Sequence, residues 1–318
     1  MKGLELSEKY FESFGRPMLE ENFQDLLPFI AVGLTGSGSE CFGFDDEISR
    51  DHDFEPGFCI FIPGEDIIDR KQAFALERAY AKLPKEFEDV KRSQIAPVGG
   101  SRHGVIRTDE FFREKTGLEM EGTGSLIITE RDWMTIPDYA LAEAVNGRIF
   151  LDNYGEITNI RNQLSNMPED IRRKKLAGSI LLMAQAGQYN FPRILMHGEP
   201  AAAQMAVFEF VKSAMQTVFL LNRRYMPFYK WSFRALSQLP MLSELADTFH
   251  YLLTTDNEGL IGEDKTGIIE GVADRIIEVL KEQELTQATC HDLEKHAYSV
   301  NDSIMDVNIR NMHILSAV

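Results

Sequence analysis

The chain has 318 residues, of which 33 are lysine or arginine and 50 are aspartate or glutamate, so its formal net charge at pH 7 is −17. This balance disfavours a protein that coats DNA or an anionic membrane, because both attract positively charged faces. The composition, 44% hydrophobic and 26% charged, is typical of a globular protein. Three cysteines, an N-terminus without an apolar signal region and no membrane-length apolar stretch predict a cytoplasmic protein without a membrane partner.

The first half of the chain is predicted to mix helices and strands. The first thirty residues show apolar positions at helical spacing, and Pro17 is expected to separate two short helices. A compact apolar run at 29–34 ends in Thr35-Gly36-Ser37-Gly38-Ser39, which is typical of a buried strand entering a loop. The expected strands are 29–34, 58–62, 104–108, 126–129 and 148–151, and a helix is expected at 67–83.

After about residue 155 the pattern becomes helical. Amphipathic stretches at 171–187, 201–223, 231–237, 242–253 and 268–285 predict helices. The stretch from 201 to 223 carries an apolar stripe of period 3.6, which we interpret as core. The predicted fold class is therefore α+β, with a small mixed sheet in residues 1–154 and an all-α domain in residues 155–318.

One segment between the first two predicted strands is strongly acidic. From Glu40 to Glu55 there are seven acidic residues and a single basic one, Arg50. If Asp51-His52-Asp53 is extended, the two aspartates share one face with Cα atoms about 7 Å apart, and they repel unless a cation lies between them. Mg²⁺ or Mn²⁺ suits such carboxylates. The alternative is a solvated acidic loop without a ligand.

Better-known ligand motifs do not fit this region. An EF-hand loop that begins at Asp51 requires glycine and glutamate where the chain has Pro56 and Ile62. The loop that begins at Gly36 has no Gly-Lys pair for a Walker A motif, and a Rossmann fingerprint fails at Cys41.

A nucleotidyltransferase pattern does fit. The superfamily that includes DNA polymerase β and the aminoglycoside adenylyltransferases has Gly-Ser after a strand, then roughly a dozen residues, then Asp-x-Asp. Here Gly38-Ser39 precedes Asp51-His52-Asp53, with an apolar run in front. The chain more closely resembles a bacterial family of unknown function whose members are described as predicted nucleotidyltransferases. The similar segments are residues 38–46, 49–53, 132–133, 147–152 and 222–231.

The resemblance implies a nucleotidyltransferase-type domain followed by a helical domain, and a reaction. Gly38 and Ser39 would contact the phosphates of a nucleoside triphosphate, expected to be ATP, together with Arg50. Asp51 and Asp53 would act as catalytic metal ligands for Mg²⁺. An acceptor hydroxyl would attack the α-phosphorus and release pyrophosphate.

One part of the superfamily pattern is missing. A third carboxylate is expected on the strand at 104–108, which has none in its middle. Asp109 is the nearest substitute and Glu110 is next, with Glu130 and Asp152 more distant, although Asp109 also suits a helix cap. Without that acid the chain would bind a nucleotide and transfer slowly or not at all. Two alternatives therefore remain, a nucleotide-binding or regulatory protein on the same scaffold and a metal-dependent phosphohydrolase.

A second segment offers cations beside aromatic side chains. In residues 223–231, Lys230 is the preferred further contact for a phosphate, and the alternative is an ordinary connection between helices at Pro227. The negative charge favours a small-molecule acceptor over nucleic acid. The acceptor's identity, the base preference and the oligomeric state do not follow from these motifs.

Overall fold

The computed structural model describes residues 1–48, 55–92, 103–122 and 124–318. Contacts divide the chain into two compact units, one of residues 1–129 and 140–166 and the other of residues 130–139 and 167–318. The first unit holds a sheet with helices and the second is helical, so the α+β class expected from the sequence is confirmed. As a division into domains, the boundary predicted after residue 154 stays a prediction.

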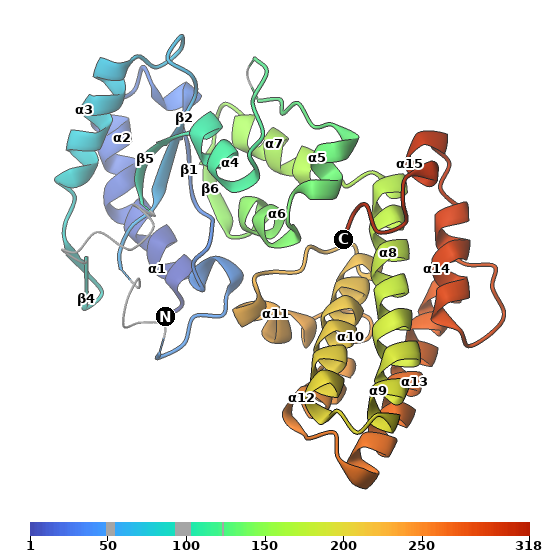
Figure 1. The fold of residues 1–318 in the computed structure, drawn as a ribbon. Coiled ribbons are helices and arrows are strands. Elements are labelled where there is room, and N and C mark those ends of the chain that lie inside the picture. Colours follow the sequence, from blue (N-terminus) through green and yellow to red (C-terminus); the bar gives the residue numbers. More distant parts are fainter. Residues whose placement is uncertain (49–54, 93–102, 123) are drawn as a thin grey trace. The chain divides into compact units, whose positions relative to one another are not determined.

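In the first unit, the described residues form one four-stranded mixed sheet (Figure 1). Its strands, in the order of the sheet, are β5 (Gly104–Arg107), β2 (Cys59–Ile62), β1 (Ala31–Leu34) and β6 (Arg148–Asp152). β1 is antiparallel to both β2 and β6, whereas β2 is parallel to β5. The strands predicted near these four positions are confirmed, and both β1 and β2 are buried along their whole length.

The register of the sheet decides which ends of the strands lie at the same edge. Gly33 pairs with Cys59, Leu34 with Arg148, and Cys59 with Gly104. The last residue of β1 and the first residues of β2, β5 and β6 therefore share one edge, which we call the loop edge. The last residues of β2, β5 and β6 lie at the opposite edge.

The other elements of the first unit surround this sheet. They are α1 (Gly3–Tyr10), η1 (Phe11–Gly15), α2 (Arg16–Asn22), η2 (Leu27–Phe29), η3 (Glu40–Phe42), α3 (Arg70–Ala81), β3 (Glu86–Phe87), β4 (Val90–Lys91), α4 (Thr108–Thr116) and α7 (Glu156–Ser165). α1, η1 and α2 follow one another without a gap, and Gly15 keeps a right-handed helical conformation. Pro17 therefore lies in the first turn of α2, where proline is tolerated, and not in a break between two helices.

The strand expected at 126–129 is wrong. Leu126 makes one isolated bridge to Met120, and its backbone N–H donates to Gln163 Oε1 at 3.1 Å. The bridge itself is closed by the N–H groups of Glu121 and Ile127, which donate to the carbonyls of Ser125 and Glu119, so the Leu126 N–H points away from Met120. A side chain from α7 therefore occupies the side on which a second strand would have paired with Leu126.

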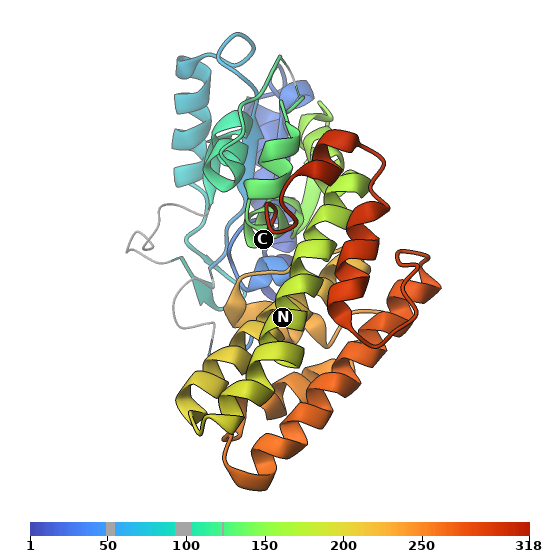
Figure 2. The ribbon, with the colours of Figure 1, turned by 45° about the vertical axis from the view of Figure 1, so that its right-hand side comes forward.

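The second unit consists of helices. They are α5 (Glu130–Thr135), α8 (Glu169–Met183), η5 (Ala184–Asn190), α9 (Phe191–Met196), α10 (Pro200–Leu221), α11 (Tyr229–Leu236), α12 (Leu245–Thr254), α13 (Gly259–Glu282), α14 (Leu293–Asp302) and α15 (Val307–Asn311), and α6 (Asp138–Val145) crosses from this unit into the first. α8 packs against both α10 and α14, and runs between them in Figures 1 and 2. Within the described part of the chain, no helix combines the length and the apolar character needed to span a bilayer.

The apolar stripe of α10 forms core, as its period predicts. Val207, Val211, Ala214 and Val218 are buried against the neighbouring helices. Phe208 departs from this pattern because 57% of its surface is exposed. Met215 and Phe219, which follow Phe208 on the same side of the stripe, are buried, so Phe208 is a local exception.

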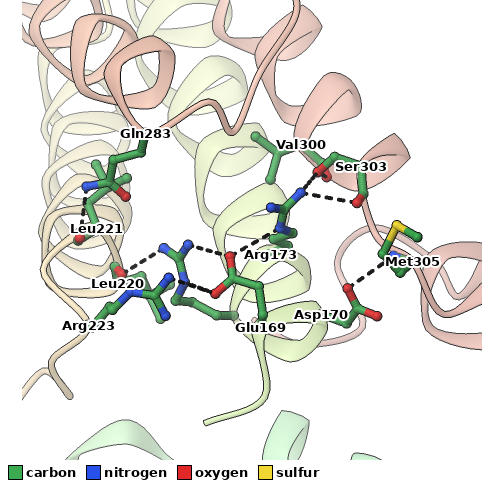
Figure 3. A network of polar contacts seen from close by, with 11 residues as sticks. Glu169, Asp170, Arg173, Leu220, Leu221, Arg223, Gln283, Val300, Ser303 and Met305 are labelled. Carbon is green, nitrogen blue, oxygen red and sulfur yellow. Dashed lines mark hydrogen bonds and ion pairs between the residues drawn. The ribbon is translucent and has the colours of Figure 1, made fainter. Parts of the chain in front are cut away.

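A charged network ties the start of α8 to the neighbouring helices (Figure 3). The Glu169 carboxylate accepts hydrogen bonds from Arg172 and Arg173 and pairs with Arg223 at 3.0 Å. Arg172 also donates to the Leu220 carbonyl at 3.2 Å, near the end of α10. Burial opposes the ionisation of Glu169, but the three arginines outweigh it and lower its pKa to about 2.

Candidate functional site

The loop that follows β1 is held at its base by a side chain from far along the sequence. Asn146 Oδ1 accepts from the Gly36 N–H at 2.9 Å, and its Nδ2 donates to the Gly36 carbonyl at 2.7 Å. The Thr35 hydroxyl donates to the Asn146 carbonyl at 3.0 Å. These bonds satisfy backbone groups that no strand partner covers, and they fix where the loop leaves the sheet.

Glycines allow β6 to approach this loop closely. A Cβ on Gly147, whose φ is +67°, would lie 2.0 Å from the Leu34 carbonyl oxygen. A Cβ on Gly33 would lie 2.6 Å from the Arg148 carbonyl oxygen. Any other residue at these positions would push the strands apart and move the loop.

Gly38 and Ser39, the predicted phosphate contacts, lie at the loop edge and lead into η3. Gly38 is buried, and a Cβ there would lie 1.9 Å from Glu40 Oε1. The Ser39 hydroxyl lies 3.4 Å from Glu40 Oε2. A carboxylate with only 7% of its residue surface exposed thus lies beside both positions. A phosphate at Gly38 requires this side chain to turn away or a cation to bridge the two anions.

Lys115 is a cation at this loop that the sequence analysis missed. Its Cε lies 3.9 Å from where a Cβ on Gly36 would be, and its ammonium pairs with Glu143 at 3.4 Å. Its charge is also felt at Cys59, where burial nevertheless raises the pKa of the thiol to about 12. The sequence contains a signal for this position of Lys115, because a helix of about 13 Å that follows β5 returns toward the edge where β5 began.

The central predicted residues, Arg50, Asp51 and Asp53, lie outside the described residues. On the far side of their segment, Glu55 Oε1 lies 3.1 Å from Nδ1 of His103, just before β5 begins. A Cβ on Gly57 would lie 2.7 Å from the same imidazole ring. The chain therefore approaches β2 at the loop edge.

Two acidic residues on the near side of that segment have structural roles. Asp45 is buried, accepts from the Gly3 N–H at 2.9 Å, and has Lys2 Nζ 3.5 Å from its other oxygen. Asp46 accepts from the Ile48 N–H at 3.1 Å. These bonds secure the chain to the N-terminal helix and form a local turn, so part of the acidic excess is used for folding.

Asp109 lies at the opposite edge of the sheet from Gly38 and Ser39. It is in the first turn of α4, beyond the end of β5, and a four-residue strand spans about 10 Å. Asp109 lines a cavity of about 300 Å³ with Asp66, Glu119 and Glu156. Burial raises the pKa of Glu156, although a hydrogen bond with Thr108 opposes this shift.

Among the other candidates for a third carboxylate, Asp152 lies at the same edge as Asp109, opposite the loop edge. Asp152 ends β6 and accepts from the Gly155 and Thr158 N–H groups, both at 2.8 Å. Glu110 is exposed on α4, and Glu130 begins α5 in the second unit. A catalytic role for Asp109 or any of these residues stays a prediction.

The described residues contain no group of three histidine, cysteine or acidic side chains arranged to hold a metal ion. Asp51 and Asp53, whose carboxylates have the ligand chemistry that Mg²⁺ prefers, lie outside the described residues, and their role as metal ligands stays a prediction.

Lys230 belongs to the second unit and is exposed on α11. Its ammonium lies 4.9 Å from the centroid of the Trp231 ring, a cation–π contact. Arg223, in the same predicted segment, is part of the Glu169 network. Lys230 as a nucleotide contact stays a prediction.

Comparison with known proteins gives one family match. Residues 133–232 match the model described as a domain of unknown function, DUF4037. The resemblance inferred from the sequence to a family of unknown function is confirmed for this segment. The segment includes Asn146 and Gly147, which fix the base of the loop, and ends in α11, but Gly38 and Ser39 lie before it.

The comparison with solved structures gives a distant likeness. The chain is similar to a nucleotidyltransferase-like protein from Exiguobacterium sibiricum 255-15, with 13% identity and a TM-score of 0.36 over 92% of this chain and 90% of that one. A likeness this distant establishes no activity. No curated protein matches the chain.

Proposed function

We propose that this protein binds a nucleoside triphosphate with Mg²⁺ at the loop edge and transfers its nucleotidyl group to a hydroxyl of a small acceptor. The observation that supports this best is the convergence at one edge of the sheet. The loop with Gly38 and Ser39 leaves β1 there, and residues 55–58, which follow Asp51 and Asp53 in the sequence, enter β2 there.

The described residues suit the binding of phosphate. The exit of the loop is fixed by Asn146, which lowers the entropy lost when a ligand binds. The Ser39 hydroxyl is a hydrogen-bond donor for a phosphate oxygen, and Lys115 brings a positive charge to the base of the loop. Arg50 and Lys230 are proposed as further contacts.

The metal would be held by Asp51 and Asp53. When bound, Mg²⁺ would neutralise the charge that develops on the phosphates. It would also offset Glu40, whose carboxylate otherwise repels an anion at Gly38. This is why we expect binding of the triphosphate to require the metal. The same requirement favours a small acceptor, because the rest of the chain has an excess of negative charge.

A second candidate function, nucleotide binding without transfer, rests on the composition of β5. Its residues are Gly104, Val105, Ile106 and Arg107, and none is acidic. Arg107 is used for folding, because its guanidinium donates to the carbonyls of Pro63 and Ile68. A site with two carboxylates and no third would retain the nucleotide and lack a base for the acceptor hydroxyl.

The experiment is a calorimetric titration of ATP and of GTP into the full chain, with and without Mg²⁺. We expect binding that needs Mg²⁺ and is lost in the double variant Asp51→Asn, Asp53→Asn, whereas the matched control Asp109→Asn binds normally. Binding that ignores both the metal and the double variant would refute the site. Release of pyrophosphate from ATP with a pool of small metabolites then separates transfer from binding alone.

A further inference from the structure

The second unit contains a cavity of about 970 Å³ that the proposed nucleotide site does not use. Residues of α8, α10 and α11 line it, together with the segment 134–139 and the last two residues of the chain. All of these residues belong to one unit. The volume is at the upper end of the range for small-molecule sites, about 300 to 1,000 Å³.

Most of the cavity wall is apolar. Leu182, Val211 and Met215 contribute aliphatic surface from α8 and α10. Tyr139 and Phe228 add aromatic rings, which meet edge to face with centroids 5.6 Å apart. Phe208, the exposed residue of the α10 stripe, also lines the cavity. An apolar wall of this kind favours the hydrophobic body of a ligand.

A buried ion pair interrupts this wall. Lys175 Nζ lies 2.8 Å from Asp138 Oδ1, and the two side chains are 4% and 7% exposed. Gln216 donates to the other oxygen of Asp138. Asp138 therefore has a donor on each oxygen, while Lys175 and Asp138 together carry no net charge.

Two other buried lysines of this unit show how a folded helical protein satisfies an ammonium group. Lys174 donates to Asn301 Oδ1 and to the carbonyls of Arg310 and Met312. Lys265 donates to the carbonyls of Leu252 and Thr255 and to Asn257 Oδ1. An ammonium has three N–H donors, so each of these lysines has a partner for every donor.

Lys175 differs from both. Among the described residues its ammonium contacts a single acceptor, Asp138, and it lines the cavity. Two of its three N–H donors are therefore left for whatever the cavity holds. Burying such donors without an acceptor is costly, which gives the position a specific preference for an oxygen atom.

We propose that this cavity binds a neutral amphipathic small molecule with an aromatic or aliphatic body and one carbonyl or other oxygen acceptor directed at Lys175. A neutral ligand is favoured over a carboxylate, because Asp138 already balances Lys175 and a second anion would add an unpaired buried charge. The proposal does not depend on nucleotidyl transfer, since no residue of the cavity belongs to the loop edge.

The test uses the full chain and the neutral naphthyl ketone fluorophore prodan as a reporter. We expect saturable, blue-shifted emission when prodan enters the cavity. Three competitors of similar size then separate the ligand classes: acetylnaphthalene, isopropylnaphthalene and naphthoate. Acetylnaphthalene should displace prodan at a concentration about tenfold lower than isopropylnaphthalene, because only the ketone accepts from Lys175. Naphthoate should compete more weakly than the ketone.

Variants locate the probe. Leu182→Trp fills the cavity and should weaken prodan binding at least about tenfold, whereas Leu260→Trp, at an exposed position of α13, should leave it unchanged. The double variant Lys175→Met, Asp138→Leu removes the pair without stranding a charge, and it should abolish the preference for the ketone. Circular dichroism checks that each variant is folded.

Three results would overturn the proposal. They are no saturable binding of prodan, equal binding in the Leu182→Trp and Leu260→Trp variants, and equal competition by the ketone and the hydrocarbon in the wild-type chain. Stronger competition by naphthoate than by the ketone would overturn the assignment to a neutral ligand.

Discussion

The two candidate sites of this chain position their polar groups by different means. At the loop edge, a side chain more than a hundred residues away in sequence bonds the backbone of the loop: Asn146 holds Gly36 by two hydrogen bonds. In the helical cavity, packing between helices places Lys175 beside Asp138. The first arrangement depends on one amide group, whereas the second depends on burial of many residues.

This difference has consequences for what each site tolerates. The loop edge is acidic and polar, so the nucleotide proposed there must bring or share a cation. The cavity is apolar with a neutral ion pair, so its ligand must bring hydrophobic surface. Substitutions that remove a single polar group at each site test how much that group contributes to the free energy of unfolding or to ligand binding.

The largest effect is expected in the cavity wall. Asp138→Ala leaves Lys175 charged and buried without its partner, and we expect the free energy of unfolding to fall by about 4 kcal/mol. Urea denaturation of the wild-type and variant chains measures the difference.

The control for this substitution is the double variant Lys175→Met, Asp138→Leu, which should recover most of the lost stability because it removes both charges. If the single and double variants were equally unstable, the loss would come from packing around residue 138 and the ion pair would matter little.

Asn146→Ala should have the next largest effect. It removes two bonds to the Gly36 backbone and leaves those groups unsatisfied, so we expect a loss of about 2 to 3 kcal/mol in the free energy of unfolding. Asn153→Ala is a matched control, because Asn153 makes one exposed bond, to the Leu27 carbonyl at 2.9 Å. Equal losses in the two variants would show that Asn146 does not hold the loop.

Much of the fold could be predicted because its signals are local. The apolar runs of β1, β2, β5 and β6 and the 3.6-residue stripe of α10 depend on neighbours within a few residues. The false strand at 126–129 shows where this fails, since Gln163 takes the backbone donor of Leu126. No local pattern contains that contact.

The candidate site shows the same limit. The Gly38-Ser39 loop was recognisable from the sequence, but Asn146 comes from a distant segment, and its contact with Gly36 became visible only with the fold. Periodicity also assigned the whole α10 stripe to the core, although Phe208 is exposed and lines the cavity.

A pH effect of intermediate size is expected from Glu169, on α8. Its pKa is lowered from 4.5 to about 2 in the folded chain, so its contribution to stability is complete above about pH 4.5 and is lost as the pH falls toward 2. Because the side chain is 37% exposed, solvent screening reduces the effect, and we expect Glu169→Gln to cost about 1 to 2 kcal/mol at pH 7.

Urea denaturation at pH 7 and near pH 3 measures this contribution. The difference in stability between wild type and Glu169→Gln should shrink at the lower pH. Glu12→Gln, which breaks an exposed pair between η1 and Arg16 at the start of α2, should have a smaller effect at pH 7. If Glu169→Gln lowered the free energy of unfolding equally at the two pH values, the charge of Glu169 would not be the source of its stabilising effect.

The smallest effect is expected at the loop edge, and it depends on the proposed nucleotide site. Glu40→Gln keeps the size of the side chain beside Gly38 and Ser39 but removes its charge, so repulsion of a phosphate there falls. We expect the affinity for Mg²⁺–ATP to rise about threefold at low salt, and the gain to shrink as salt increases. Calorimetric titration measures this affinity, and the control is Glu47→Gln, at an exposed position of the same acidic segment.

An unchanged affinity in Glu40→Gln, with the wild type still binding in a metal-dependent way, would place the phosphates away from Gly38. A weaker affinity would instead show that the Glu40 carboxylate helps to hold the cation, which would add to Asp51 and Asp53 the third acid that β5 does not provide.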